Sequence, residues 1–143
     1  MRLAALIATA AVLAGTAPGY AASGKDLLDT PARPSALAER RLITSIARGG
    51  DQAVVAVGQR GHALRSTDNG KSWSQASVPV SSDLTAVQFV DSRVGYAVGH
   101  DGVVLRTADG GATWSRVLDG RTANKLLHKH YRRALWDRTK RSG

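Results

Sequence analysis

Short runs of apolar and β-branched residues alternate with turn residues through the middle of the chain. Runs of five to seven residues that are bounded by glycine, asparagine, aspartate or serine predict strands, because helices need longer segments. The run 53–57 is apolar on both of its faces, which predicts a strand covered from both sides. The expected strands are 42–46, 53–57, 62–66, 73–78, 84–90, 94–98, 103–107 and 114–118.

The same pattern recurs after 41 residues. Residues 42–75 align with 83–116 without a gap, and 11 of the 34 aligned pairs are identical. A period of about 40–50 residues with four short strands in each unit is typical of a propeller blade. We therefore predict an all-β fold, a β-propeller fragment of two four-stranded blades at 42–82 and 83–118.

Two kinds of turn connect the expected strands. The segments 58–61 and 99–102 begin and end with glycine and predict hairpin turns in which glycine supplies a positive φ. The segments 66–73 and 107–114 share the pattern Ser/Thr-x-Asp-x-Gly-x-Ser/Thr-Trp. Its residues are Ser66, Asp68, Gly70 and Trp73 in the first copy, and Thr107, Asp109, Gly111 and Trp114 in the second.

In such a motif the aspartate accepts hydrogen bonds from nearby backbone N–H groups, glycine takes the left-handed conformation, and tryptophan packs on the blade. The motif resembles the Asp-box, or bacterial neuraminidase repeat, which is a structural turn remote from the ligand face in the proteins that carry it. We therefore expect Asp68 and Asp109 to brace their turns and to have no catalytic role.

The two ends of the chain differ from the repeats. Arg2 precedes an uncharged apolar run at 3–17, and small residues follow it, which predicts a signal peptide at 1–21 with cleavage after Ala21. The run is shorter than the about 20 residues that span a membrane. We therefore expect an exported protein, periplasmic or secreted. Residues 22–41 read as a linker or lead-in.

Charge is concentrated in the last part of the chain, which we expect to be a basic amphipathic helical tail at 119–143. The 143 residues carry 20 Lys+Arg and 11 Asp+Glu, a net charge of +9. Residues 116–143 hold nine cations and two acids, +7, whereas 22–115 hold ten and nine, +1. The apolar positions of this expected helix recur at steps of three and four residues. They are Ala123, Leu126, Leu127, Tyr131, Ala134 and Leu135.

Three interpretations of this tail stay open. We favour a helix that packs on the blades with a solvated outer face. The helix could instead lie on an anionic membrane surface, with Lys125, Lys129, Arg132 and Arg133 as candidate contacts. An exported protein meets lipid more readily than nucleic acid, so we do not expect nucleic-acid binding. In the third interpretation, the residues after about 127 are out of frame and have no selected role.

Several kinds of site are disfavoured by the residues present. The absence of cysteine excludes disulfides and thiolate metal sites, and the chain has a single glutamate, Glu39. A sialidase or other glycosyl hydrolase, which the Asp-box also suggests, would need a tyrosine paired with a glutamate and an arginine cluster. His128 and His130 diverge on a helix and do not share a metal. We expect no catalytic residue, no metal and no cofactor.

With the signal peptide, the two Asp motifs and the phrases at 55–58, 95–99 and 102–107, the chain resembles the photosystem II stability/assembly factor-like family over about residues 40–127. The resemblance implies an exported, non-catalytic propeller that acts as a protein-binding scaffold. In photosynthetic members the partner is an assembling reaction-centre protein of photosystem II, on the lumen side of the thylakoid. Other bacterial members share the name with no settled activity.

Two further expectations concern the binding face and the length. Arg65 and Arg106 occupy equivalent places in the repeats, and a guanidinium suits an anionic partner. Both are candidate binding residues, although we favour their pairing with acids at the blade edges. Two blades are fewer than the about four that a closed propeller needs. We expect a truncated product rather than a ring closed by several copies or an unstable chain.

Overall fold

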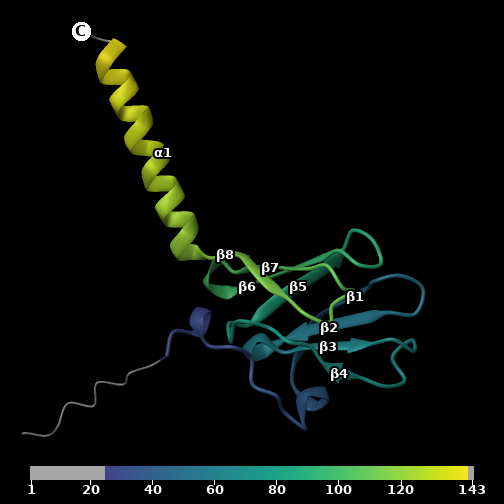
Figure 1. The fold of residues 1–143 in the computed structure, drawn as a ribbon. Helices are drawn as coiled ribbons and strands as arrows, with labels where there is room; N and C mark the ends of the chain where they lie inside the picture. The colour runs from purple at the N-terminus through teal and green to yellow at the C-terminus, as the bar shows by residue number, and fades with distance from the viewer. Residues whose placement is uncertain (1–24, 142–143) are drawn as a thin grey trace, which may run out of the picture.

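In the computed structural model the backbone is described for residues 25–141 and the side chains for residues 25–133 (Figure 1). The predicted signal peptide at 1–21 lies outside these residues. Two four-stranded antiparallel sheets, which we call blade 1 and blade 2, precede one long helix, and this confirms the predicted fold class.

Blade 1 holds β1 (Ile43–Arg48), β2 (Val54–Gly58), β3 (Ala63–Ser66) and β4 (Ser74–Gln75); blade 2 holds β5 (Leu84–Phe89), β6 (Gly95–Gly99), β7 (Val104–Thr107) and β8 (Ser115–Leu118). Short 3₁₀ turns are η1 (Leu27–Asp29), η2 (Ala38–Arg40), η3 (Gln59–Gly61) and η4 (His100–Gly102), and the helix is α1 (Gly120–Arg141).

The strand β4 is shorter than the sequence predicts. We expected a strand over 73–78, but β4 ends at Gln75. Beyond Gln75 the backbone pairs with the other blade: Ser77 N donates to Ala112 O at 3.2 Å, and Trp114 N donates to Ser77 O at 3.0 Å. These hydrogen bonds across the two blades satisfy backbone groups that a longer β4 would have used within blade 1.

The hairpin turns η3 and η4 use their two glycines in different ways. Gly61 and Gly102, at the ends, have positive φ values of 70° and 65°, as the sequence predicts. Gly58 and Gly99, at the beginnings, have extended backbone instead. A Cβ on Gly58 would lie 2.1 Å from the carbonyl oxygen of Leu42, so the first glycine is needed for close approach of the neighbouring strand.

The two blades stack face to face and share one hydrophobic core (Figure 1). The face of blade 1 that packs against blade 2 carries Val55, Val57 and Ala63, each 0 % exposed. We call this face, and its equivalent in blade 2, the forward face of the blade. Blade 2 meets it with its backward face, which carries Ala97 and Leu105, also 0 % exposed.

The other two blade faces differ. The backward face of blade 1 is covered in part by Ala38, which packs against Ala56 and Leu64, so β2 is buried at all five of its positions. The forward face of blade 2 has no such cover within the described residues. Its residues Tyr96 and Val98 on β6 are each 40 % exposed.

Beyond its first turn, the helix α1 does not pack on the blades along its described side chains. It extends away from both sheets (Figure 1), and Leu126, Leu127 and Tyr131 are 58 %, 55 % and 64 % exposed. The favoured interpretation of a helix packed on the blades is therefore wrong for these three residues. Among the helices that the structure describes, none is both long enough and apolar enough to span a bilayer.

Candidate functional site: a basic groove

Residues 25–41, expected to be a linker, fold tightly onto the blades. Asp26 Oδ1 accepts a hydrogen bond from Leu28 N at 2.9 Å and begins η1. Leu28 is 5 % exposed and packs in the core between the blades. Ala32 N donates to Val78 O at 3.0 Å, which ties the segment to the chain between the blades. The lead-in is thus part of the folded body.

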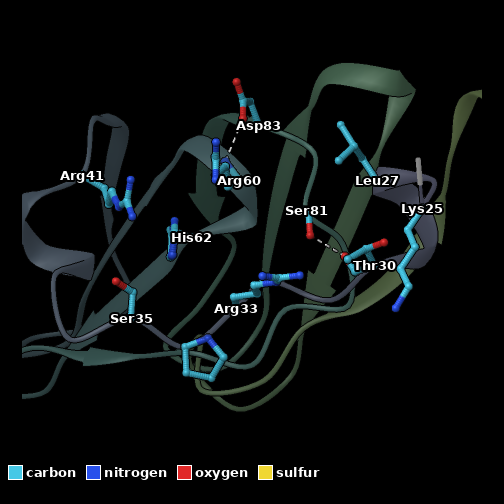
Figure 2. Close-up of a pocket in the computed structure, with 11 residues that line it drawn as sticks. Lys25, Leu27, Thr30, Arg33, Ser35, Arg41, Arg60, His62, Ser81 and Asp83 are labelled. Atoms are coloured by element: carbon cyan, nitrogen blue, oxygen red, sulfur yellow. Dashed lines mark hydrogen bonds between the residues drawn. The ribbon is translucent and has the colours of Figure 1, made fainter. Parts of the chain in front are cut away.

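One glutamine of blade 1 fixes the bend of the lead-in. Gln75 Oε1 accepts from Ser35 N at 2.9 Å, and Gln75 Nε2 donates to Arg33 O at 2.9 Å. Both polar groups of the amide are used, and they hold the backbone on either side of Pro34. This places the Arg33 side chain among the residues that line a pocket beside η3 (Figure 2).

The first turn of the tail is fixed to the lead-in by a two-pronged ion pair. Arg121 Nη1 donates to Asp29 Oδ2 and Nη2 donates to Asp29 Oδ1, both at 2.8 Å. The hydrogen bonds from Arg121 lower the pKa of Asp29 to about 2, with Arg116 contributing less. One cation that the sequence assigns to the tail is therefore neutralised within the body.

A groove of about 800 Å³ lies between the lead-in, η3 and the connection from β4 to β5 (Figure 2). Four cationic side chains line it against one carboxylate, that of Asp83. The cations are Lys25, Arg33, Arg41 and Arg60. Asp83 Oδ1 already accepts the Arg60 backbone N–H at 2.7 Å, so this carboxylate is engaged in holding η3. The balance of charge in the groove is positive and favours an anionic ligand.

A histidine on the wall of the groove carries an unused polar atom. His62 is 4 % exposed, and its Nδ1 donates to Gln59 O at 2.9 Å, since a carbonyl oxygen only accepts. Its Nε2 is the buried side-chain atom without a partner in the part of the chain whose side chains are described. Buried polar groups are nearly always paired, so this unpaired atom behind the wall of the groove is unusual.

The first Asp motif forms a closed set of hydrogen bonds. Asp68 Oδ1 accepts from Ser66 Oγ at 2.7 Å and from Ser72 N at 2.9 Å, and Asp68 Oδ2 accepts from Ser72 Oγ at 2.5 Å. The hydrogen bonds from Ser72 lower the pKa of Asp68 most. Trp73 Nε1 donates to Gly70 O at 3.1 Å. We call residues 66–73 and 107–114 the Asp turns.

The second Asp turn repeats this geometry in blade 2. Asp109 accepts from Thr107 Oγ1 at 2.8 Å and from Thr113 N at 2.9 Å, while Trp114 Nε1 donates to Gly111 O at 3.2 Å. Burial raises the pKa of Asp109, but the hydrogen bonds from Thr113 and Thr107 outweigh it, and the net pKa is about 2. Both carboxylates are occupied by their own turns, at the opposite ends of β3 and β7 from η3 and η4.

The other predicted binding residues lie outside the groove. Arg65 Nε donates to Gly110 O at 2.9 Å between the blades, so Arg65 is neither on an open face nor paired with an acid. Arg106 is half-buried on the forward face of blade 2. The four remaining candidates, on α1, are exposed and do not line the groove. They are Lys125, Lys129, Arg132 and Arg133.

The groove was missed because its residues are distant in sequence and look ordinary one by one. A usable signal was present: residues 33–41, just before the first blade, hold Arg33, Arg40 and Arg41 against the single acid Glu39. Nothing local indicated that this segment would fold back against Arg60 and His62. Among the residues that the structure describes, no three His, Asp or Glu side chains gather as a metal site.

Comparison with known proteins gives a family and a fold. A family model described as photosynthesis system II assembly factor YCF48 matches residues 38–108 and 65–130. The solved structure "YCF48 bound to D1 peptide" is 22% identical, with a TM-score of 0.50, over 55% of this chain and 26% of that chain. YCF48 from Cyanidioschyzon merolae is 28% identical, with a TM-score of 0.47, over 54% and 24%. The chain thus spans about a quarter of each solved relative, and no curated protein matches significantly.

The family match and the fold agree. The two matched ranges together run from 38 to 130 and include both blades and the beginning of α1. The first solved relative supports the same sheet architecture. The chain belongs to the family of the photosynthesis system II assembly factor YCF48.

Proposed function

We propose that this chain is a non-catalytic, protein-binding member of its family and that the basic groove receives an acidic, extended segment of a partner protein. The observation that carries the proposal is the set of four cations that line the groove with a single carboxylate among them. The carboxylates of Asp68 and Asp109 are used inside the Asp turns, which leaves binding as the chemistry that the groove supports.

A peptide suits this groove better than a small anion. A groove of about 800 Å³ is large enough for several residues, and its charged lining is mostly cationic. Acidic side chains or a terminal carboxylate of the peptide would meet the arginines. The solved relative bound to a D1 peptide supports a peptide ligand. In a photosynthetic organism, we propose a photosystem II reaction-centre protein as the partner.

The groove is tested by removing two cations that are exposed and lie outside the core. The double variant Arg41→Ala/Arg60→Ala should weaken binding of a fluorescent acidic peptide about tenfold, since each exposed ion pair contributes about 0.5–1 kcal/mol. Fluorescence anisotropy at low and moderate salt measures the effect, and binding of the wild-type chain should fall as salt rises.

Arg93→Ala is the matched control, because Arg93 is an exposed arginine on blade 2 away from the groove. It should bind the peptide as the wild-type chain does. Equal affinity of the double variant and the wild-type chain would contradict the proposed groove, and so would equal affinity for an acidic peptide and its lysine-containing counterpart.

The exposed tail supports a second candidate function, binding to an anionic membrane surface. Leu126, Leu127 and Tyr131 are more than half exposed on α1. Lys125 and Lys129 lie on the same helix, so α1 offers both apolar and cationic groups. Such helices lie in the interfacial plane of a bilayer with the apolar residues inserted.

Leu127→Asp should reduce co-sedimentation with vesicles that contain phosphatidylglycerol, because it places a charge among the residues that would insert. Binding of the wild-type chain should also weaken with salt, since cations near an anionic surface contribute about 1 kcal/mol each at low ionic strength. Thr122→Asp, which adds the same charge at an exposed position on the other face of α1, is the control. Salt-insensitive binding would argue against this function.

We also propose that the chain is exported, as its first 21 residues predict. The composition of this segment, a cation before a short apolar run and then small residues, supports the proposal. It would bring the groove and α1 to a compartment where membrane surfaces and assembling membrane proteins are both accessible.

A further inference from the structure

The contact between the two blades is built from two complementary faces. On the forward face of blade 1, Arg65 Nε donates to the carbonyl oxygen of Gly110 at 2.9 Å. Val55 lies against Gly111, so closely that a Cβ added there would be 2.5 Å from Val55 Cγ2. A valine and an arginine of one blade thus fit the Asp turn of the next.

The forward face of blade 2 repeats this chemistry and is open. The 41-residue repeat places Tyr96 where blade 1 has Val55, and Arg106 where it has Arg65. These two residues are direct neighbours across β6 and β7, as Val55 and Arg65 are across β2 and β3. No hydrogen bond from the Arg106 side chain is found among the described residues, whereas Arg65 has its carbonyl acceptor.

The complementary surface is also present and open, on the backward face of blade 1. A groove of about 320 Å³ lies there against the first Asp turn, lined by Ile46, Val54, Gly70 and Trp73 among others. Gly70 and Trp73 are the repeat equivalents of Gly111 and Trp114. The equivalent position on blade 2 is filled by Val55 and Arg65 of blade 1, whereas no described residue of another blade fills it on blade 1.

We propose that copies of this chain associate head to tail, with the forward face of blade 2 of one copy on the backward face of blade 1 of the next. Tyr96 enters the groove beside Gly70 and Trp73. The Arg106 guanidinium donates to the carbonyl oxygen of Asn69, the equivalent of Gly110. The contact joins two different surfaces, so it can repeat from copy to copy and close into a ring.

Two features of blade 1 limit this contact. Ala38 already covers Ala56 and Leu64, so the next copy reaches only the half of the face near the Asp turn unless the lead-in moves. Arg48 stands in the groove where blade 2 has Phe89, whose ring packs edge-on against Trp114 with centroids 6.3 Å apart. A cation facing Arg106 repels it, so we expect weak association that salt strengthens.

This inference is independent of the basic groove, because the groove beside Gly70 and Trp73 shares no lining residue with it, and Tyr96 and Arg106 line neither. A peptide could bind a single copy, and copies could assemble without a peptide. Failure of one proposal therefore leaves the other standing, and the two are tested with different variants.

The test is the molar mass of the full chain, measured by light scattering or sedimentation over a wide range of protein concentrations. The wild-type chain should form larger species reversibly as concentration rises. Tyr96→Lys should weaken this association about tenfold or more, because it removes the central aromatic anchor and adds a charge. Asn124→Lys adds the same charge on α1, outside both blade faces, and should leave association unchanged.

Arg48→Phe supplies a gain-of-function test. It copies Phe89 of blade 2 into blade 1 and removes the repulsion with Arg106, so it should strengthen association about tenfold. Circular dichroism and thermal unfolding of each variant confirm that the fold is kept. A chain that stays monomeric at every concentration, with or without Arg48→Phe, overturns the proposal, and so does a Tyr96→Lys variant that assembles like the wild-type chain.

Discussion

Blade 1 and blade 2 carry the same repeat, yet the same position is buried in one and exposed in the other. Val57 is 0 % exposed, whereas Val98, one repeat later, is 40 % exposed. The difference is the neighbour, since blade 2 covers the forward face of blade 1 and no described residue covers that of blade 2. Burial in a repeat protein is thus a property of the stack and not of the repeat itself.

The Asp turns, in contrast to the blade faces, hardly differ between the two blades. Asp68 and Asp109 receive the same hydrogen bonds from the same relative positions, although Trp114 is buried between the blades and Trp73 is half-buried. Local hydrogen bonds are fixed by the motif alone. The repeat sequence alone therefore fixes the hydrogen bonds of the Asp turns, whereas the burial of a blade face depends on whether another blade covers it.

The largest difference in the free energy of unfolding should come from placing an aspartate on each of the two forward faces. Val57→Asp buries a carboxylate without a partner in the shared core, so we expect it to lower the free energy of unfolding by about 3–5 kcal/mol. Val98→Asp places the same group on the open face and should cost about 1 kcal/mol or less. Urea unfolding measures both, at a protein concentration where the chain is monomeric. Equal losses would mean that the two faces are equally covered.

A smaller difference should separate the glycines of the two Asp turns. Gly70 and Gly111 both have positive φ, 87° and 89°, so alanine costs about 1 kcal/mol at either position. At Gly111 the new Cβ would also meet Val55 Cγ2 at 2.5 Å, whereas at Gly70 the nearest atom is 3.5 Å away. Gly111→Ala should therefore lose about 1–3 kcal/mol more than Gly70→Ala.

Thermal unfolding measures this second comparison, and a double variant identifies its cause. Adding Val55→Ala removes the methyl group that the new Cβ meets, so Gly111→Ala should cost less in that background than in the wild-type chain. The two substitutions would then be coupled. Simple additivity would contradict the close contact between the blades.

Strands and turns could be predicted from the sequence because their causes are local. Alternation, glycine and the Asp motif lie within about ten residues of one another, and seven of the eight strands lie within two residues of their predicted bounds. The eighth, β4, ends early because Ser77 pairs with blade 2, a partner 35 residues away in sequence. The end of β4 therefore depends on how the blades stack, which no local sequence pattern indicates.

The binding surfaces could not be predicted because they are made by distant segments. The groove needs Arg33 and Arg41 of the lead-in to lie beside Arg60 and His62, which follows from the hydrogen bonds of Gln75 and the burial of Ala38. The packing of α1 was misjudged for a related reason. Its apolar periodicity predicts a helix, but it does not say whether a surface is available to receive that helix.

The smallest expected effect is a dependence of the free energy of unfolding on pH, and it should be similar in the two blades. The pKa of Asp109 is about 2 in the folded chain, below the about 3.9 of an unfolded aspartate, so its ionised form stabilises the fold. This stabilisation is fully present above about pH 4 and is lost as the pH falls toward 2. Asp109→Asn should thus be less stable than the wild-type chain at neutral pH, with a difference that shrinks below pH 4.

Asp68→Asn should show the same trend, because the hydrogen bonds from Ser72 lower the pKa of Asp68 in the same direction. Urea unfolding between about pH 2 and 7 measures both variants. Asp51→Asn, at an exposed aspartate outside the Asp turns, is the matched control for the change from carboxylate to amide. A difference from the wild-type chain that stays constant down to pH 2 would show that the carboxylates do not brace their turns through their charge. A trend in blade 2 alone would show that even the Asp turns depend on the stack, since Asp109 is the one beside a neighbouring blade.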